Sequence, residues 1–256
     1  MTIQRTDTGS RNLSVRIAKS DEEIYEAQRL RYKVFAEECG ARLISEEESI
    51  DRDHFDAYCD HLIVRDTETD EVVGTYRILT SMQSRAAGGF YSQTEFNLSN
   101  LSSLCPGLVE VGRSCIHPAY RQGRAMSLLW SGLAQYILAR GFDYLMGCAS
   151  ISLSDGGRVA RETYYRLNST RLSPKEWRVM PYQPFPLEEV VEGRHAILPP
   201  LIKGYVRLGA LICGPPAWDQ QFRTADLLML LSISRMDPRY ARHFFGVPVL
   251  SHIVAA

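Results

Sequence analysis

No stretch of this sequence is apolar over enough residues to cross a membrane. Charged or polar residues interrupt every hydrophobic run well before the roughly 20 residues that a transmembrane helix requires. The opening segment, MTIQRTDTGSRN, is polar and lacks the charged-then-apolar order of a signal peptide. We therefore expect a cytoplasmic protein.

Cysteine pairs, repeats and nucleic-acid motifs are also missing. The six cysteines are scattered without a CxxC pair, so we expect reduced, mostly buried thiols, with no metal and no disulfide framework. The sequence contains no internal repeat or low-complexity tract. A formal net charge of −1 at pH 7, without a known binding motif, argues against a nucleic-acid partner.

Charge is distributed unevenly along the chain. Between residues 37 and 60 nine acidic residues stand against two arginines, whereas between 113 and 207 thirteen Lys and Arg stand against seven acids. An acidic front and a basic back suit a cationic substrate on one side and an anionic partner on the other, and ordinary solvated surface is the alternative. The acidic segment 44–62 carries too many charges for burial and is interpreted as a long loop.

Hydrophobic periodicity predicts strands and helices in one mixed α/β domain. Strands are expected at 14–20, 61–66, 71–80, 109–116, 144–152 and 224–234, the second and third forming an antiparallel hairpin. Helices are expected at 21–40, 124–140, 157–167, 198–212 and 238–245, the first opened by a Ser20–Glu23 capping box. Residues 81–107 are expected to form a loop with one helical turn, and 213–222 a turn. We interpret residues 1–13 as a flexible N-terminus and 14–256 as a single domain.

The stretch 109–126, VEVGRSCIHPAYRQGRAM, predicts a strand, a tight turn and a helix start in direct succession. A glycine-containing turn that opens a helix leaves backbone N–H groups unpaired and directs the positive end of the helix dipole outward, which suits a phosphate. Arg121 and Arg124 beside the turn would strengthen such a site. A purely structural strand–turn–helix unit is the alternative.

Five segments, in this order, resemble the GNAT superfamily, and within it the acyl carrier protein-dependent L-ornithine N-alpha-acyltransferases. They are DHFDAYCDHLIV, EVGRSCIHPAYR, SLLWSGLAQY, GCAS and LPPLIKGYVRLGA. The spaced signature of the related acyl-homoserine-lactone synthases is similar to the set Arg31, Phe35, Asp53, Asp56, Arg77, Glu110 and Arg113. The resemblance covers residues 15–245. It implies a GNAT-like, mostly antiparallel twisted sheet flanked by helices, with a C-terminal extension that completes the core.

The resemblance also implies an activity: transfer of a 3-hydroxyacyl group from acyl carrier protein (ACP) to the alpha-amine of L-ornithine, giving lyso-ornithine lipid. No cofactor would be bound permanently, because the donor is the acyl-phosphopantetheine arm of ACP. The alternatives are acylation of another amino acid, acyl-homoserine-lactone synthesis, and non-catalytic binding of the carrier protein. An insoluble acyl product is compatible with peripheral contact at the inner membrane.

One departure concerns the turn that holds coenzyme A in ordinary GNAT acetyltransferases. Tyr120 occupies the basic position of that turn, and Arg121 is displaced by one residue. This change weakens binding of the coenzyme A pyrophosphate. A phosphopantetheine arm has a single phosphodiester and needs fewer hydrogen-bond donors. The departure therefore favours a carrier-borne donor over free coenzyme A.

Amide formation from a thioester requires a neutral amine, and Glu110 is the candidate to accept the amine proton. Arg113 would anchor the substrate carboxylate or hold Glu110 in place, and an ion pair of Glu110 with Arg113 or Arg77 is the structural alternative. A covalent route through Cys115 or Cys148 is set aside, because neither has an evident histidine partner.

Asp53, Asp56 and Asp60 are the candidates for holding the cationic end of the amino acid, and their spacing places them on one face if the segment is helical. A solvated acidic loop is the alternative. Arg31 and Arg77 are counted with the substrate-binding residues, where they would order this loop by ion pairing.

The pantetheine phosphate is expected at the turn. The cofactor-binding candidates are Arg121, Gly123, Arg124 and Ala125, through the backbone N–H groups and the two guanidinium groups. Arg121 and Arg124 would also meet the acidic surface of ACP, along with the basic run Arg158, Arg161 and Arg166.

Overall fold

The computed structural model describes residues 12–43, 45–122, 124–187 and 197–236 of the 256-residue chain. The flexible terminus expected at 1–13 lies outside these residues except for Asn12 and Leu13, and Leu13 begins a strand. Gly123 and the helix expected at 238–245 also lie outside the described residues. Within them, no helix combines the length and apolarity needed to cross a bilayer.

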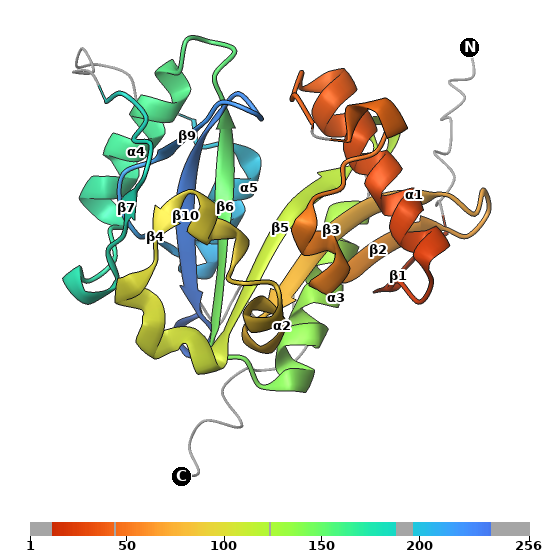
Figure 1. The fold of residues 1–256 in the computed structure, drawn as a ribbon, viewed down its shortest axis with the longest axis horizontal. Helices are drawn as coiled ribbons and strands as arrows, with labels where there is room; N and C mark the ends of the chain where they lie inside the picture. Colours follow the sequence, from red (N-terminus) through yellow and green to blue (C-terminus); the bar gives the residue numbers. More distant parts are fainter. Residues whose placement is uncertain (1–11, 44, 123, 188–196, 237–256) are drawn as a thin grey trace, which may run out of the picture.

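The described residues form an eight-stranded, mostly antiparallel sheet with the order β1–β2–β3–β5–β6–β10–β8, and β9 pairs with β10 (Figure 1). Its strands are β1 (Leu13–Ile17), β2 (Asp60–Asp66), β3 (Val72–Thr80), β5 (Leu108–Ile116), β6 (Tyr144–Ser152), β8 (Leu211–Ile212), β9 (Ala217–Asp219) and β10 (Thr224–Ser232). β4 (Phe96–Asn97) and β7 (Met180–Pro181) form a separate two-stranded ribbon. The antiparallel sheet and the β2–β3 hairpin expected from the sequence are confirmed.

Helices cover both faces of the β1–β3 region. The α-helices are α1 (Asp21–Tyr32), α2 (Ser81–Ala86), α3 (Ala125–Arg140), α4 (Arg158–Thr170) and α5 (Pro200–Leu208). Along β2, Leu62 and Val64 belong to the same hydrophobic cluster as Leu129 of α3, whereas Ile63 belongs to a cluster with Leu30 of α1. Because successive strand residues point to opposite faces, α1 and α3 lie on opposite sides of β2.

Local sequence signals set the ends of the main helices as expected. The Ser20 side chain accepts a hydrogen bond from the backbone N–H of Glu23 and caps α1, whereas the Glu23 carboxylate accepts from the backbone N–H of Lys19, so the first half of the expected capping box forms. A π-helical segment, Lys33–Glu38, continues α1 towards Gly40, which has a positive φ of 74°. Gly141, with a φ of 68°, ends α3 in the left-handed conformation that glycine adopts readily.

Three regions are more ordered than the sequence indicated. Residues 81–107 were expected to form a loop with one turn, but they contain α2, β4 and a 3-10 helix at Ser99–Gly107, because buried Phe96 and Leu101 anchor them to the core. The helix expected at 198–212 ends at Leu208 and is followed by β8. The turn expected at 213–222 includes β9.

The central strands β5 and β6 diverge along their length, and the candidate site lies where they separate. They are parallel and paired only from Leu108 to Glu110 on β5, against Tyr144 to Met146 on β6. The next residue, Gly147, lies so close to β5 that a Cβ there would be 2.3 Å from the carbonyl oxygen of Val111. Beyond this point the strands diverge, and Figure 1 shows β5 leaning away from the upright β6 and β10.

Candidate active site

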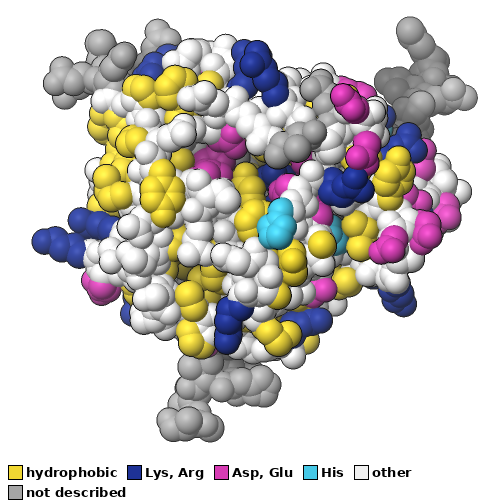
Figure 2. Space-filling model, viewed as in Figure 1, with side chains coloured by type: hydrophobic (Ala, Val, Ile, Leu, Met, Phe, Trp, Pro, Cys, Tyr) yellow, Lys and Arg dark blue, Asp and Glu magenta, His cyan; other side chains and the backbone are white. Residues whose placement is uncertain are grey.

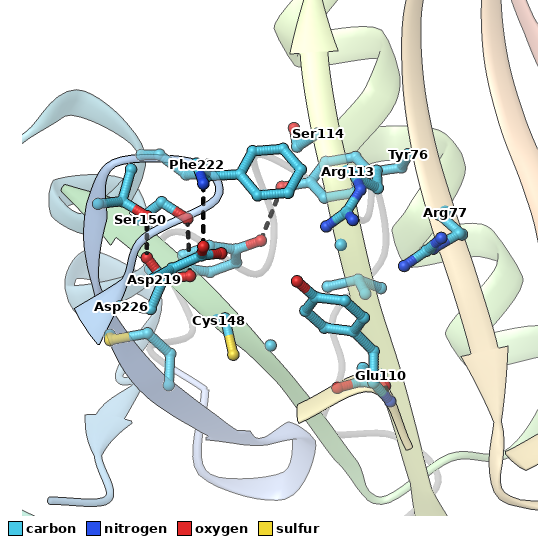
Figure 3. Close-up of a pocket in the computed structure, with 18 of the residues that line it drawn as sticks. Tyr76, Arg77, Glu110, Arg113, Ser114, Cys148, Ser150, Asp219, Phe222 and Asp226 are labelled. Carbon is cyan, nitrogen blue, oxygen red and sulfur yellow. Dashed lines mark hydrogen bonds between the residues drawn. The ribbon is translucent and has the colours of Figure 1, made fainter. Parts of the chain in front are cut away.

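A cavity of about 490 Å³ occupies the space between the diverging strands. One wall comes from β5 with Glu110 and Arg113, and the other from β6 and β10 with Cys148 and Asp226. In the space-filling view of Figure 2, acidic side chains are visible deep in a hollow on the upper part of the face. Figure 3 shows Asp226 on the β6–β10 side facing Glu110 and Arg113 on the β5 side, with Cys148 between them.

Glu110 lies where the two strands separate, since it pairs with Met146 as the last β5 residue bonded to β6. The backbone N–H of Tyr91 donates to its Oε2 at 2.6 Å, the N–H of Ser92 donates to its Oε1 at 2.8 Å, and the Ser92 hydroxyl also donates to Oε1. Within the described part of the chain these are its hydrogen-bond partners, rather than Arg113 or Arg77. Burial raises the pKa of Glu110, although the bonds from Ser92 and Tyr91 oppose the shift.

Arg113 occupies a β-bulge in β5. Thr75 of β3 pairs with Cys115 and Arg77 pairs with Gly112, so two β5 residues stand opposite one β3 residue. The φ of Arg113 is 51°, a conformation that costs roughly 1–3 kcal/mol for a side chain of this kind. A bulge redirects the side chain. Here the guanidinium carbon lies 4.8 Å from the ring centroid of Tyr91 and 4.4 Å from that of Phe222, facing the cavity.

Three arginines and three aspartates form a buried ionic network behind the cavity. Arg31 donates to Asp51 and Asp56, Arg77 to Asp53 and Asp56, and Arg113 to Asp51 and Asp53, with N–O distances of 2.6–3.1 Å. The network therefore unites Arg31, Arg77, Arg113, Asp53 and Asp56, which the sequence had singled out, with Asp51, which it had not.

The acidic segment is therefore partly buried, contrary to the expectation that its charges would keep it in solvent. Asp51 is 2% exposed and Asp56 is 5% exposed, because arginines from α1, β3 and β5 neutralise them. Burial by itself would raise the pKa of Asp56, but Arg31 and Arg77 lower it well below its ordinary value.

Asp60 lies apart from the other two predicted aspartates. The segment is helical only over a 3-10 turn, His54–Tyr58, which Asp53 caps through its bond to the N–H of Phe55. Asp60 already belongs to β2, and its carboxylate accepts a hydrogen bond from the hydroxyl of Tyr136 on α3. The single helical face that would join Asp53, Asp56 and Asp60 does not form.

The turn between β5 and α3 holds the predicted phosphate-binding residues. Arg121 donates to both carboxylate oxygens of Glu38, a residue that lines the cavity, at 2.5 and 2.6 Å. Arg124 is exposed at the N-cap of α3, and Ala125 is buried at its first position. The first N–H groups of α3 face outward from the helix end, as such groups do. The hydroxyl of Tyr120 donates to Asp66 of β2.

The sequence reading missed a second group of acids in the cavity region. Asp226 accepts hydrogen bonds from Thr224 and Ser150, at 2.6 and 3.1 Å, and Glu95 lies close to it with both carboxylate oxygens buried. Burial and the charges of Asp226 and Asp219 raise the pKa of Glu95 to about 9, and burial and the charge of Asp219 raise the pKa of Asp226 to about 6. The one available signal was Asp226 itself, an isolated acid within the apolar run ADLLMLL.

We expect Glu95→Gln to stabilise the acceptor-free protein at alkaline pH. A carboxyl whose pKa is raised to about 9 by burial keeps its proton in the folded state while the unfolded chain ionises above its ordinary pKa, so its penalty to folding grows from about pH 4.5 to pH 9. The variant should melt about 4–8 °C higher than the parent at pH 8 and at nearly the same temperature at pH 4.5. Thermal melts across this range measure the difference, and an equal shift at both pH values would contradict the cause.

The cavity cysteine is poorly suited to be a nucleophile. Burial raises the pKa of Cys148 well above that of a free thiol, and burial likewise raises the pKa of Cys115. The thiolate is the nucleophilic form of cysteine. A covalent acyl-cysteine route therefore gains no support from the geometry, and Cys148 contacts the Ser92 hydroxyl at 3.3 Å instead.

A twisted sheet whose central parallel strands separate around a cavity, with a helix starting just after the first of them, is the architecture of the GNAT fold. Residues 30–131 match the family model of the acetyltransferase (GNAT) domain. The AHL synthase LasI shares the fold, with a TM-score of 0.53 at 14% identity over 93% of this chain and 96% of that one.

Two curated relatives specify the family further. The chain is 38% identical over 256 residues to the L-ornithine N(alpha)-acyltransferase of Rhizobium meliloti (strain 1021), covering 91% of this chain and 84% of that protein. It is also 38% identical over 250 residues to the L-ornithine N(alpha)-acyltransferase of Brucella abortus (strain 2308), covering 91% and 89% respectively. The chain belongs to the L-ornithine N(alpha)-acyltransferase family.

Proposed function

We propose that this protein transfers a 3-hydroxyacyl group from ACP to the alpha-amine of L-ornithine and so forms lyso-ornithine lipid. The observation that carries the proposal is Glu110, a buried carboxyl at the point where β5 and β6 separate, lining the cavity between them. The names of the curated relatives support ornithine as the acceptor, and the geometry of the site supports Glu110 as the proton acceptor.

The amine must lose a proton before it can attack the thioester. Glu110 accepts that proton, directly or through a water, in the proposed reaction. Burial raises the pKa of Glu110 towards that of an amine, which makes the transfer less uphill. The hydrogen bonds from Tyr91 and Ser92 hold the carboxylate in one orientation, with both oxygens engaged on the side of the 90–94 segment.

The thioester lies between the separated strands in this proposal. Attack by the amine forms a tetrahedral intermediate whose oxygen carries negative charge. In the described residues, β5 and β6 are not paired beyond Glu110 and Met146. The backbone N–H groups on their facing edges are therefore available to donate to that oxygen. As the intermediate collapses, its nitrogen loses its second proton and the pantetheine thiolate leaves and takes up a proton, which gives the amide on the amino acid and the free thiol on ACP.

The carrier enters from the side of the β5–α3 turn. Arg124 is exposed there, and Arg121 is held against Glu38 at the cavity. The pantetheine phosphate would meet the first N–H groups of α3, and the acidic surface of ACP would meet these arginines together with Arg158, Arg161 and Arg166. Peripheral contact with the inner membrane would follow from the amphipathic product rather than from a spanning helix.

Arg113 is the candidate for the substrate carboxylate, because it lines the cavity with its guanidinium group. Its Nε and Nη2 donate to Asp51 and Asp53 at 3.1 Å, and its ring contacts with Tyr91 and Phe222 fix its plane. In the proposal the N–H groups of Arg113 that do not bond to Asp51 or Asp53 donate to the acceptor carboxylate, because arginine commonly binds carboxylates through two N–H groups.

An acceptor and donor screen tests the proposal. The pure protein is incubated with 3-hydroxyacyl-ACP and each amino acid in turn, and the free thiol of ACP and the mass of the acylated product are measured. We expect ornithine-dependent thiol release and N-acyl ornithine, with slower turnover when acyl-coenzyme A replaces acyl-ACP.

The screen also separates the competing functions. A preference for a neutral amino acid or for S-adenosylmethionine would replace ornithine as acceptor and leave the reaction class intact. Tight ACP binding without thiol release for any acceptor would contradict the enzyme and favour a carrier-binding protein.

A further inference from the structure

The aspartates that the sequence assigned to a cationic substrate have little charge left to offer. Asp51, Asp53 and Asp56 are bonded to Arg31, Arg77 and Arg113, three positive charges against three negative ones. A cation entering the cavity would meet a neutral network at this wall, with the Arg113 guanidinium in front of it. An attraction for a second ammonium group must come from other carboxylates.

The opposite wall carries acids that are not paired with arginine in the described structure. Asp226 of β10 stands in register with Ser150 of β6, and Asp219 of β9 pairs with Thr224 next to it along the sheet. Asp219 and Asp226 both line the cavity. Figure 3 shows the two carboxylates together on the β6–β10 side, across the cavity from Arg113.

Glu95 lies next to this wall, close to the lining residues Asp226 and Cys148. Both of its carboxylate oxygens are buried, and neither has a hydrogen-bond partner among the described residues. One carboxylate oxygen of Glu95 lies within 4.8 Å of an oxygen of Asp226 and of the Cys148 sulfur. A buried carboxylate without a donor is costly unless a cation or a proton meets it. The group is therefore short of one positively charged or donor-bearing partner.

We infer that Glu95 and Asp226, with Asp219 beside them, form the subsite that receives the side-chain ammonium of the acceptor amino acid. The inference rests on the proposed function and assigns the part of the site that selects a diamino acid. An ammonium group has three N–H donors, which matches the open carboxylate of Glu95 and the second lone pairs of Asp226.

The subsite lies close to the chemical centre. The Cys148 sulfur is within 4.8 Å of carboxylate oxygens of Glu95 and Asp226, it lies 3.3 Å from the Ser92 hydroxyl, and that hydroxyl donates to Glu110. A substrate with its alpha-amine at Glu110 can therefore place a second amine at Glu95 through a short aliphatic chain. The raised pKa of Glu95, caused by burial and by Asp226, agrees with a pair that holds a proton until a cation replaces it.

A metal ion is the competing occupant of the same three groups. Burial raises the pKa of the Cys148 thiol, so it stays protonated and is a weak metal ligand. Serine and threonine hydroxyls already occupy one oxygen each of Asp226. These features favour an organic ammonium, and the experiment includes a chelator to decide between the two.

The test compares ornithine with norvaline, which has the same carbon chain without the second amine. The parent should acylate ornithine with a kcat/KM at least about 100-fold above that for norvaline. Glu95→Gln should lower the ornithine value about 10- to 100-fold, mainly through KM, and leave the norvaline value unchanged or higher. Asp226→Asn should act in the same direction, and Glu95→Asp, which keeps the charge, should retain most of the preference.

Glu48→Gln is the matched control, since Glu48 pairs with Arg52 at the surface and both side chains are about half exposed. It should leave both constants at the parental values. Calorimetry with ornithine or norvaline, without donor, adds a readout that does not depend on turnover: ornithine should bind more weakly to folded Glu95→Gln than to the parent.

Several outcomes would overturn the subsite. These are an equal loss for ornithine and norvaline in folded Glu95→Gln, a loss of ornithine preference in Asp53→Asn but not in Glu95→Gln, and a preference that a chelator removes and a divalent cation restores. If the parent itself acylates only neutral amino acids, the proposed acceptor fails instead, and that result is separate because it is seen before any substitution.

Discussion

Replacing Glu110 with glutamine is expected to lower kcat about 100- to 1,000-fold with ornithine and acyl-ACP. An amide cannot accept the amine proton, and loss of a general base typically removes this much of the rate. The substitution also places an NH₂ group against the N–H donors of Tyr91 and Ser92, so one hydrogen bond is lost. Single-turnover rates and the thermal stability of the variant should be measured together, because the first should fall far more than the second.

The pH profile separates a base from a merely structural acid. A base must be deprotonated, so the parental rate should fall as the pH drops through the pKa of Glu110, which burial raises above its ordinary value. In Glu110→Gln that limb should disappear, and the residual rate should follow ionisation of the amine alone. Ser92→Ala serves as a control that keeps the carboxyl and removes one donor to it, and it should retain the limb. A folded Glu110→Gln protein with parental kcat would rule out the proposed base.

Replacing Arg31 with methionine is expected to destabilise the fold by about 3–5 kcal/mol. Arg31 is fully buried, and it donates to Asp51 at 2.7 Å and to Asp56 at 2.6 Å. Removing one partner of a buried ion pair leaves the other charge without compensation, which is the costly outcome. The loss is a large share of the roughly 5–15 kcal/mol that stabilises a typical domain. Urea denaturation at neutral pH measures it, with the slope of the transition checked for change.

Arg52→Ala is the matched control for Arg31. Arg52 also pairs with an acid of the 44–62 segment, Glu48, but both side chains are about half exposed, so the change should cost less than about 1 kcal/mol. Without Arg31 the network has three aspartates against two arginines, and the deficit of Arg31→Met should shrink when the pH falls below the ordinary carboxyl range, because protonation of Asp56 removes the excess negative charge. A deficit below 1 kcal/mol, or one that does not change with pH, would contradict the role of the network.

Much of the fold could be read from local signals. Ser20 and Gly141 act at helix ends, where a side-chain acceptor or a left-handed residue is needed, and these needs depend on nearby residues alone. The β2–β3 hairpin was predicted for the same reason. Residues 81–107 were predicted less well, because their order comes from Phe96 and Leu101 packing against distant strands.

The candidate site divides in the same way. Glu110 and Arg113 could be named from one strand, but the bulge that turns Arg113 towards Tyr91 and Phe222 depends on the register with β3. The role of the acidic segment was misjudged for a related reason, since the charges that bury Asp51 and Asp56 lie on three other elements. Charge counted along the chain carries no information about such partners.

The sequence by itself determined the order of most strands and helices, the turn before α3, the set of charged residues from Arg31 to Arg113, and membership of the family. Periodicity, helix caps and motifs are properties of residues that are close in the sequence, so they can be recognised from the sequence alone. Only the tertiary structure decided which carboxylates are neutralised and which are left open. Glu95 and Asp226 are 131 positions apart, and they come together because β10 pairs with β6 along one wall of the cavity while Glu95 precedes the buried Phe96. Electrostatics acts through space, and the sheet determines which charges meet.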